Sequence, residues 1–349
     1  MLDVLARHRV ERLVAVRDER SGLEALIVID DVTLGPAAGG VRTRAYPSLD
    51  DAVADCARLA RAMTVKCALG GLDAGGGKAV VLDHPGLDRP RAFAVLGERI
   101  AELGGLFRTA GDLGTTAADL AAMARFCRWV HTDESNLAGA VARGLVRCVE
   151  ACVRARAGAG AHRIQLDGLR VAVQGCGAIG AAVAEALAER GVVLTVADVD
   201  AGRARAVADK TGARVASPDA ILVADVDVIA PCAIGGVVTA DVAAALRAWA
   251  VCGAANNILA DERAGRALAE RGISVVPDVV ASAGAVIEGI GHSVMGLRDR
   301  TPLIERLGDT AYALLVEAAR TGRTTAELAV EHARDRIAAT RARLTADLA

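Results

Sequence analysis

Lysine is nearly absent from this chain of 349 residues. Of its 41 basic residues 38 are arginine, and the three lysines are Lys66, Lys78 and Lys210. Arginine keeps its proton in proteins, whereas the pKa of a buried lysine can fall towards neutrality. A lysine that remains in such a chain is therefore a candidate for chemistry that needs a titratable amine. Lys210 lies in a polar stretch and is assigned to the surface, which leaves Lys66 and Lys78 as candidates.

An excess of charge is also missing, as are long hydrophobic runs. The net charge is −2, so the chain lacks the basic excess that favours binding to nucleic acid. No uncharged apolar run is long enough to span a membrane, and the first residues lack the apolar core of a signal peptide. The eight cysteines contain no CxxC pair. We therefore expect a cytoplasmic protein with reduced, mostly buried thiols and without nucleic-acid or membrane partners.

Strands alternate with helices in the second half of the chain. From about residue 168, short apolar runs are separated by helical stretches, which predicts a parallel, doubly wound α/β sheet. The length suits two domains with a large core. In the first half we expect a strand at 23–34, helices at 48–63, 90–103 and 116–127, and a glycine-rich loop at 70–77; residues 302–346 are expected to be helical.

A GxGxxG motif occupies Gly175–Gly180, directly after a predicted strand and at the start of a predicted helix. Its first glycine permits a tight turn, its second lets a pyrophosphate approach the backbone, and its third lets helix and strand pack closely. Asp198 ends the next strand, where a carboxylate accepts hydrogen bonds from a ribose 2′-hydroxyl and repels a 2′-phosphate. The motif therefore favours NAD over NADP, although Arg203 and Arg205 lie nearby. The alternative is a glycine-rich turn that serves another ligand.

Two amines and one carboxylate in the first half suggest the chemistry. Lys66 ends a helix-like segment, Lys78 follows the glycines at 75–77, and Asp112 lies in a polar turn. Together they would suit an amino acid or a 2-oxo acid, because one lysine can bind the α-carboxylate while the other, with a lowered pKa, acts at C2. The alternative is that Lys66 is a solvated helix end and Lys78 a cation at a strand edge.

Six segments carry a resemblance to a known family. They are residues 34–42, 60–81, 109–116, 230–236, 252–257 and 277–289, and they occur in the order seen in the Glu/Leu/Phe/Val dehydrogenase family. The chain most resembles the leucine, valine and phenylalanine dehydrogenases, from about residue 12 to 345. The resemblance implies reversible oxidative deamination of an L-amino acid with NAD, giving a 2-oxo acid and ammonia. It also implies a homo-oligomer, either a dimer or an octamer.

The resemblance implies a two-domain α/β fold as well. Residues 1–133 would form a substrate domain with a mixed sheet, and about 318–349 would pack back on it. Residues 134–317 would form a Rossmann domain with a doubly wound sheet. The active site is expected in a cleft between the two domains.

Residues that match the family's motifs receive roles from the resemblance. Lys66 resembles the lysine that binds the substrate carboxylate, Lys78 the lysine that activates water and polarises the carbonyl, and Asp112 their acid/base partner. The two adjacent asparagines would contact the substrate amine and the nicotinamide amide, in an order that stays open. The other expected substrate-binding residues are Gly39, Gly40, Ala38, Gly111, Asn257, Val286 and Gly289, and the cofactor-binding residues are Gly175, Gly177, Ala178, Ile179, Gly180, Asp198, Cys232, Ala233 and Asn256. The six histidines are dispersed, so no metal site is expected.

The sequence departs from the family in three places. The segment 131–144 is short, and Val141 stands where a threonine is expected, or Ala140 or Ala142 under a slightly shifted alignment. Ser282 replaces an asparagine. Ala38, Gly111 and Gly289 are smaller than usual, which favours a bulky substrate such as phenylalanine or tryptophan unless neighbouring side chains fill the space. Two alternatives follow, a homologue of specialised metabolism that acts on an aromatic or unusual amino acid, and a catalytically weak NAD-binding homologue. The role of Glu288, beside the expected pocket, stays open.

Overall fold

The computed structural model describes residues 2–158 and 164–347, and they form two compact units. Unit 1 comprises Met1–Glu134, Gly289–Arg298 and Ala333–Ala349, and unit 2 comprises Ser135–Glu288 and Asp299–His332. The sequence had placed 289–298 with the second domain and 318–332 with the first. The difference arises because α11 (Gly284–Met295) and α14 (Thr325–Ala346) each continue from one unit into the other, so the unit boundaries fall inside helices.

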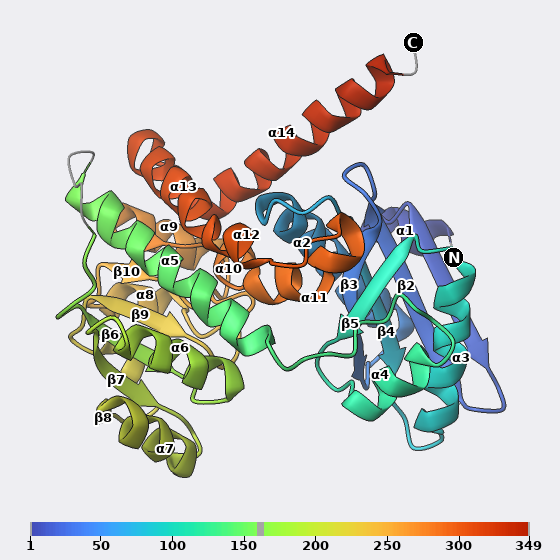
Figure 1. Ribbon diagram of the computed structural model, residues 1–349, viewed down its shortest axis with the longest axis horizontal. Helices are drawn as coiled ribbons and strands as arrows, with labels where there is room; N and C mark the ends of the chain where they lie inside the picture. The colour runs from blue at the N-terminus through green and yellow to red at the C-terminus, as the bar shows by residue number, and fades with distance from the viewer. Residues whose placement is uncertain (1, 159–163, 348–349) are drawn as a thin grey trace. The chain divides into compact units, whose positions relative to one another are not determined.

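Unit 1 is built on a mixed sheet of five strands, in the order β1-β2-β4-β3-β5 (Figure 1). The sheet is antiparallel at β1–β2 and β2–β4, and parallel at β3–β4 and β3–β5. The central strand, β4, is therefore covered by neighbours on both sides. The strands are β1 (Arg12–Asp18), β2 (Leu23–Asp31), β3 (Ala37–Arg44), β4 (Gly75–Leu82) and β5 (Phe107–Gly111).

Helices cover both faces of this sheet. One hydrophobic core joins Val28 and Val80 of the sheet to Cys56 of α2 (Leu49–Leu69), and a second joins Val81 to Phe93 of α3. The side chain of Ser48 accepts a hydrogen bond from the backbone of Asp51 and so caps α2, as its position predicts. The other helices of this segment are α1 (Leu2–His8), α3 (Arg89–Glu102) and α4 (Ala117–Ala124).

The triple glycine at 75–77 is the start of β4 and not part of a loop, which corrects the prediction from sequence. A Cβ atom at Gly76 would lie 2.2 Å from the backbone nitrogen of Thr64 in α2, and one at Gly77 would lie 3.0 Å from the ring of Phe107. The two glycines thus face opposite sides of the sheet, Gly76 against α2 and Gly77 against the ring of Phe107. Glycine here allows α2 to approach the strand on one side and leaves room for the Phe107 ring on the other, a role that the usual preference of glycine for turns concealed.

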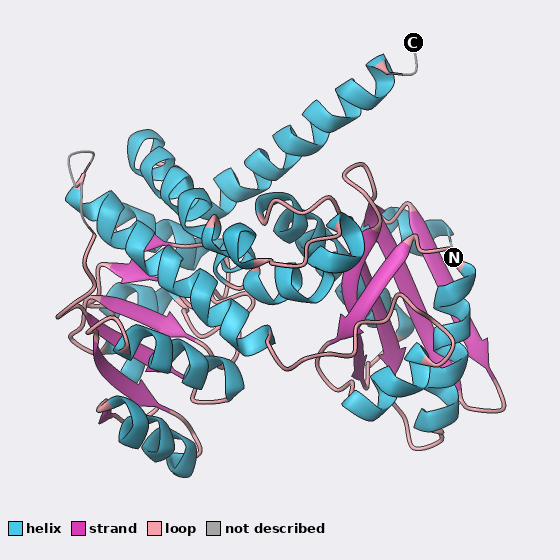
Figure 2. Ribbon diagram, in the orientation of Figure 1, coloured by secondary structure: helices cyan, strands magenta, loops and turns pink. Residues whose placement is uncertain are grey.

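Unit 2 contains a parallel sheet of six strands in the order β11-β10-β9-β6-β7-β8. Its strands are magenta in Figure 2, with helices in cyan around them. Every pairing is parallel, which confirms the doubly wound sheet predicted from the sequence. The strand order reverses between β6 and β9, the place where such sheets bind ligands. The strands are β6 (Arg170–Gln174), β7 (Val193–Ala197), β8 (Arg214–Val215), β9 (Val228–Pro231), β10 (Ala250–Val251) and β11 (Ser274–Val275).

The remaining helices follow the second half of the chain. They are α5 (Leu137–Ala157), α6 (Ala178–Ala188), α7 (Ala201–Thr211), the 3-10 helix η1 (Ile221–Val223), α8 (Ala240–Ala245), α9 (Glu262–Glu270), α10 (Asp278–Ala281), α11 (Gly284–Met295), α12 (Thr301–Glu305), α13 (Leu307–Thr321) and α14 (Thr325–Ala346). The last three of these helices show the helical character expected for 302–346.

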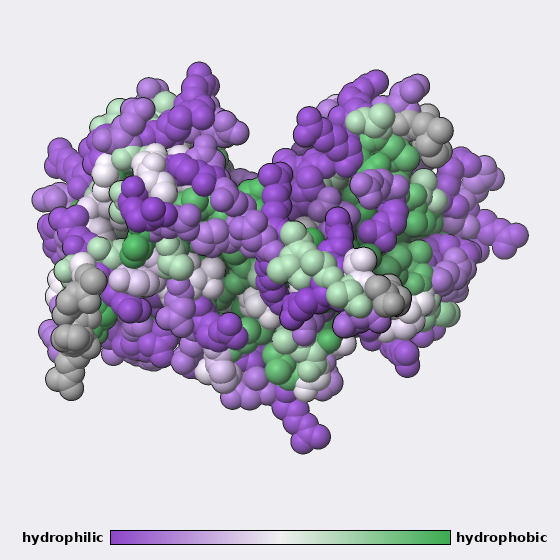
Figure 3. Space-filling model, turned by 90° about the horizontal axis from the view of Figure 1, so that it is seen from above, coloured by the Kyte–Doolittle hydropathy of each residue, from purple (hydrophilic) through white to green (hydrophobic). Residues whose placement is uncertain are grey.

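The face of the protein drawn in Figure 3 is mostly polar, and most of its thiols are buried. Among the described residues, no helix has the length and apolar character needed to cross a membrane. The face drawn in Figure 3 is largely hydrophilic, with hydrophobic patches between. All eight cysteines are free thiols and seven of them are buried, as the sequence predicted.

Candidate active site

A buried ion pair joins the two predicted catalytic residues. Lys78 Nζ lies 2.6 Å from Asp112 Oδ2, and Lys78 is only 5% exposed. Lys78 lies on β4 and Asp112 directly after β5, so the two strands that flank β3 bring them together. This position in the middle of the sheet excludes the alternative that Lys78 is a cation at a strand edge.

Burial and charge act on both members of the pair. Burial is the main influence on Lys78 and lowers the pKa of its ammonium group, against the attraction of Asp112. Burial alone would raise the pKa of Asp112, but the positive charges of Lys78 and Arg42 outweigh it and lower that pKa to about 2. The carboxylate therefore stays ionised at neutral pH, while the amine is easier to deprotonate than an ordinary lysine.

Lys66 lies on the helix that covers the same face of the sheet. It is 8% exposed and belongs to the last turn of α2, which excludes a solvated helix end. Two residues earlier, Thr64 lies against the backbone of Gly76 and donates a hydrogen bond to Asp30, with an Oγ1–Oδ2 distance of 2.5 Å. Since Gly76 faces α2, Lys78 two residues later faces it as well.

Three small residues of β3 lie beside this pair. A Cβ atom at Gly39 would lie 1.8 Å from the carbonyl oxygen of Gly77, and one at Gly40 would lie 3.0 Å from Asp112 Cβ. Ala38 is fully buried. The backbone of β3 can thus approach both neighbouring strands, and no larger side chain fits at Gly39 or Gly40.

Gly111 faces the other side of the sheet. A Cβ atom there would lie 2.6 Å from Glu134 Oε1 and 3.3 Å from Leu120 Cδ1, and Leu120 belongs to the core beneath α3 and α4. Because side chains alternate along a strand, Ala110 shares the face of Asp112. This orientation argues against the prediction that Gly111 lines a substrate pocket. Gly111 is one residue away from Asp112, and neighbouring residues of a strand face opposite sides of the sheet.

Arg42 is the functional side chain that the sequence analysis missed. Its Nε atom donates to Asp112 Oδ2 at 3.0 Å, so Asp112 Oδ2 contacts both Arg42 and Lys78. The signal that could have revealed it is its position two residues after Gly40 in β3, which places it on the same face. The strand itself was not predicted, because its glycines break the apolar alternation on which such predictions rest.

The GxGxxG turn in unit 2 has the geometry that its spacing predicts. Gly175 has a φ of +96°, and a Cβ atom at Gly180 would lie 1.9 Å from the carbonyl oxygen of Gly175. A Cβ atom at Gly177 would meet nothing within 4 Å, so open space lies in front of the backbone there. Ala178 and Ile179 begin α6, whose N-terminus has no side-chain cap. This cradle fits an anionic ligand such as a pyrophosphate.

Asp198 is held beside that turn by backbone hydrogen bonds. Its Oδ2 atom accepts from the nitrogen of Cys176 at 2.6 Å, and its Oδ1 atom accepts from the nitrogen of Asp200 at 2.8 Å. Burial acts to raise the pKa of Asp198, but the hydrogen bonds from these two donors outweigh burial, so the pKa lies below its usual value. A fixed negative charge therefore lies at the end of β7, next to the glycine cradle.

Other predicted residues gather at the same edge of the parallel sheet. A Cβ atom at Gly175 would lie 2.7 Å from Ala233 Cβ, and the nitrogen of Cys232 donates to Gln174. The nitrogen of Asn257 donates to Asp278 Oδ2 at 2.8 Å, in a backbone with positive φ.

Ser282, which replaces the expected asparagine, reaches Asn256. Its Oγ atom lies 3.5 Å from Asn256 Oδ1 and donates to the carbonyl of Asp278 at 2.7 Å. The shorter serine side chain therefore keeps a contact with the asparagine pair. Val141, at the other departure, is buried in α5.

Helix α11 carries the last two predicted substrate residues. Val286 and Gly289 are three positions apart, which places them on one face of the helix. Glu288, whose role the sequence left open, forms two hydrogen bonds with Arg300, and the side chains are 14% and 22% exposed. This partner explains a half-buried carboxylate on a mostly apolar helix.

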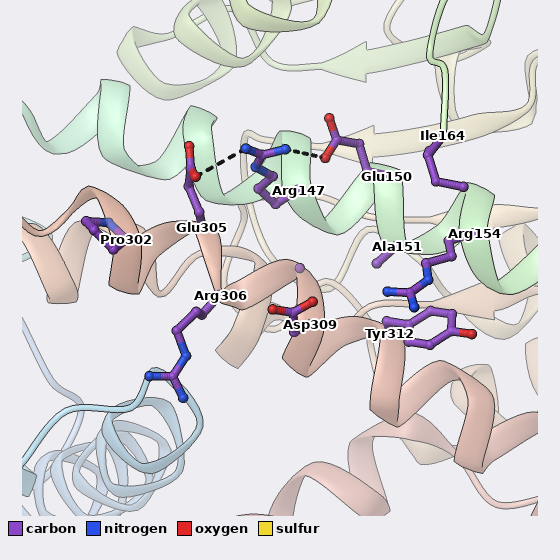
Figure 4. A pocket seen from close by; sticks show the side chains of 11 residues that line it. Arg147, Glu150, Ala151, Arg154, Ile164, Pro302, Glu305, Arg306, Asp309 and Tyr312 are labelled. Carbon is purple, nitrogen blue, oxygen red and sulfur yellow. Dashed lines mark hydrogen bonds and ion pairs between the residues drawn. The ribbon is translucent and has the colours of Figure 1, made fainter. Parts of the chain in front are cut away.

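A groove of about 520 Å³ in unit 2 contains none of the predicted residues (Figure 4). It lies along α5, α12 and α13, where Arg147 is 2.8 Å from Glu150 and 3.2 Å from Glu305. The guanidinium of Arg154 stacks on the ring of Tyr312. Three of the charged side chains that line the groove, Arg147, Glu150 and Glu305, therefore pair with one another. Among the described residues, no group of three or more potential ligands could hold a metal ion.

Comparison with known proteins identifies the class. The model of the Glu/Leu/Phe/Val dehydrogenase dimerisation domain matches residues 10–129, and that of glutamate/leucine/phenylalanine/valine dehydrogenase matches residues 200–290. Valine dehydrogenase of Streptomyces coelicolor is 36% identical over 342 residues, which are 95% of this chain and 93% of the relative. The chain therefore belongs to the Glu/Leu/Phe/Val dehydrogenase family and is an oxidoreductase of the amino acid dehydrogenase class.

Relatives within the family differ in the substrates that their names give. Leucine dehydrogenase of Thermoactinomyces intermedius is 36% identical over 294 residues, covering 82% of this chain and 79% of the relative. Among solved structures, L-tryptophan dehydrogenase from Nostoc punctiforme superposes with a TM-score of 0.86 at 32% identity, covering 98% of this chain and 99% of that one. The match over nearly the whole chain confirms the two-domain α/β fold and the resemblance found in the sequence.

Proposed function

We propose that this protein catalyses the reversible, NAD-dependent oxidative deamination of a hydrophobic L-amino acid. The products are the 2-oxo acid and ammonia. The observation that carries the proposal is the buried ion pair of Lys78 and Asp112, on the face that α2 covers with Lys66. A titratable amine beside an ionised carboxylate is what proton transfer at an amine-bearing carbon requires.

Each residue has a distinct task in this proposal. Lys66 binds the substrate carboxylate as a cation. Lys78, whose pKa is lowered by burial, takes a proton from the water that attacks C2 and later polarises the carbonyl of the product. Asp112 orients the substrate amine and exchanges its proton through the 2.6 Å contact with Lys78. The backbone of Gly39 and Gly40 lines the site beside them.

The dinucleotide is assigned to unit 2. The glycine cradle and the N-terminus of α6 would hold the pyrophosphate, and Asp198 would accept hydrogen bonds from the ribose. NAD supplies the acceptor for the hydride that leaves C2. Cys232, Ala233 and Asn256 would line the rest of this site. The fixed charge of Asp198 favours NAD, because a 2′-phosphate would face like charge.

A large hydrophobic side chain is the favoured substrate feature. Ala38 is buried close to the catalytic pair, and with Gly289 it is smaller than the family's usual residue, which leaves volume for an aromatic ring. The similar tryptophan dehydrogenase structure supports this choice, whereas the leucine and valine dehydrogenases support a branched-chain substrate. Val286 and Asn257 would complete the substrate contacts. A homo-oligomer is proposed from the dimerisation-domain match.

The test measures NADH formation with a panel of L-amino acids, and NADH consumption with 2-oxo acids and ammonia. We expect turnover in both directions of the reaction. We also expect a higher kcat/KM for tryptophan or phenylalanine than for valine, and little activity with NADP. Binding of NAD by calorimetry without turnover on any substrate would instead identify a non-catalytic homologue. Light scattering after gel filtration tests the oligomer.

A further inference from the structure

Arg42 joins the Lys78–Asp112 pair to a second carboxylate. Its Nε atom lies 3.0 Å from Asp112 Oδ2, and its Nη1 atom lies 3.2 Å from Asp55 Oδ2. The side chains of Arg42 and Asp55 are only 14% and 16% exposed. Four charges of alternating sign therefore form one continuous chain, from Lys78 on β4 to Asp55 on α2.

Asp55 is itself held at both of its oxygen atoms. Tyr46 donates its hydroxyl to Asp55 Oδ2 at 2.9 Å, and Arg58 contacts Asp55 Oδ1 at 2.6 Å. Burial, followed by this hydrogen bond, raises the pKa of Tyr46, so its hydroxyl remains a donor throughout the working pH range. Asp55 is therefore a fixed anchor for the guanidinium of Arg42.

Arginine suits this position for a geometric reason. Its donors form a rigid planar fork, so one edge can contact Asp112 while another atom contacts Asp55. A lysine carries the same charge at a single point and cannot hold two carboxylates in a defined relative orientation. The position thus uses the shape of the guanidinium as well as its charge.

We propose that Arg42, anchored by Asp55 and Tyr46, is a positioning residue that fixes the carboxylate of Asp112 on Lys78. The assignment of a role in catalysis rests on the deamination proposed above. Without the anchor, Asp112 can rotate away from Lys78, and the amine loses the partner that exchanges its proton. Asp55 then affects the reaction through Arg42 although it does not contact the catalytic pair.

Charged and titratable groups face Lys78 from the elements packed against it. Asp112 and Arg42 act in opposite directions on its protonation, and the thiol of Cys56 adds a weaker effect. On β2, Asp30 is engaged by the hydroxyl of Thr64. The groups are Asp112 after β5, Arg42 on β3, Asp30 on β2, and Asp55, Cys56 and Lys66 on α2.

The scarcity of lysine permits a direct experiment. Protein labelled with carbon-13 at lysine Cε has only three lysine signals, and Lys78→Arg assigns the one from Lys78. Its chemical shift against pH reports protonation of Lys78 without any need for turnover. The pH profile of kcat is recorded on the same samples, so an inactive wild type would reject the proposed function while the titration still tests the positioning.

Arg42→Gln gives opposite signs for positioning and for a simple charge effect. It removes a positive neighbour, which by itself would shift the titration of Lys78 upwards. If Arg42 holds Asp112 on Lys78, the carboxylate is released as well, and Lys78 titrates lower instead. Tyr46→Phe weakens the anchor without changing any charge at neutral pH and should give a smaller downward shift, while Asp55→Asn should shift the titration downwards through both effects.

Two further variants complete the design. Arg42→Lys keeps the charge and should still lower kcat at least tenfold. If Arg42→Gln does not fold, Arg42→Lys tests the positioning in its place. Arg17→Gln removes an exposed arginine from β1 that is paired with Glu19, and should leave both profiles unchanged. An upward or absent shift in Arg42→Gln, or full activity of Arg42→Lys, overturns the proposal.

Discussion

At the scale of single residues, the chain separates its three lysines by environment. Lys66 and Lys78 are buried, whereas the side chain of Lys210 is 68% exposed and pairs with Glu185. The composition singled out the three lysines, because arginine takes nearly every other basic position, and the polar context of Lys210 left two candidates. Their partner Asp112 was also found from sequence, but Arg42 was not, because its strand lacks a hydrophobic alternation.

Lys78→Ala should lower kcat by a factor of about a thousand or more, since it removes both a general base and the partner of Asp112. The matched control is Lys210→Ala, which removes a lysine from the surface of the same protein and should keep full activity. Initial rates of NADH formation at saturating substrate measure both. Substantial activity in Lys78→Ala would remove the chemical basis of the proposed mechanism.

The stability contributed by Asp112 should depend on pH. Its pKa in the folded protein is about 2, below the ordinary value of 3.8, so the ionised group stabilises the fold above about pH 4. That stabilisation is lost as the pH falls through 2. Asp112→Asn should therefore lower Tm most above pH 5, and its difference from wild type should shrink towards pH 2. A difference independent of pH in calorimetric scans would contradict this.

At the scale of elements, the glycines of β4 show where reading the sequence reaches its limit. The pattern at 75–77 is typical of a loop, and only the folded contacts with Asp31, α2 and the ring of Phe107 reveal why this strand needs three glycines. The Rossmann turn was predictable, because its glycines act within one local strand–turn–helix unit. The orientation of Gly111 was not, because it depends on the exact phase of a short strand.

Gly76→Ala tests the close approach of α2 to β4. The added Cβ atom would lie 2.2 Å from the backbone nitrogen of Thr64, so the helix must shift, and a loss of about 2 kcal/mol or more in unfolding free energy is expected. Gly139→Ala is the control, because its Cβ atom would meet nothing within 4 Å inside α5. Helix propensity predicts that this control is neutral or slightly stabilising. Denaturant titration measures both.

At the scale of the whole molecule, the candidate residues divide between the two units. Lys78, Asp112 and Arg42 belong to unit 1, whereas the glycine cradle and Asp198 belong to unit 2. The sequence predicted both architectures, because strand–helix alternation and the ordered family segments extend along nearly the whole chain. The predicted boundary after residue 133 lies within one residue of the first division between the units. The later crossings were not predicted, because α11 and α14 continue through the division without a break in their helical pattern.

Binding of NAD should therefore be separable from catalysis. Lys78→Ala should keep the rise in Tm that saturating NAD produces, a stabilisation of about 3 kcal/mol at a hundredfold excess over Kd. Gly177→Val should abolish that rise and keep the Tm of the free protein, because its side chain enters open space in front of the cradle. Thermal scans with and without NAD measure both. A normal response in Gly177→Val would place the dinucleotide elsewhere.

The buried thiols have a practical consequence. Seven of the eight cysteines are inaccessible, and burial raises the pKa of those at 56 and 67 to about 12, so few thiolates form in the native state. A thiol-reactive dye should thus label these seven thiols slowly in folded molecules and at once in unfolded ones. The protein carries its own reporter of unfolding, and the labelling rate would follow the opening of both units without an added probe.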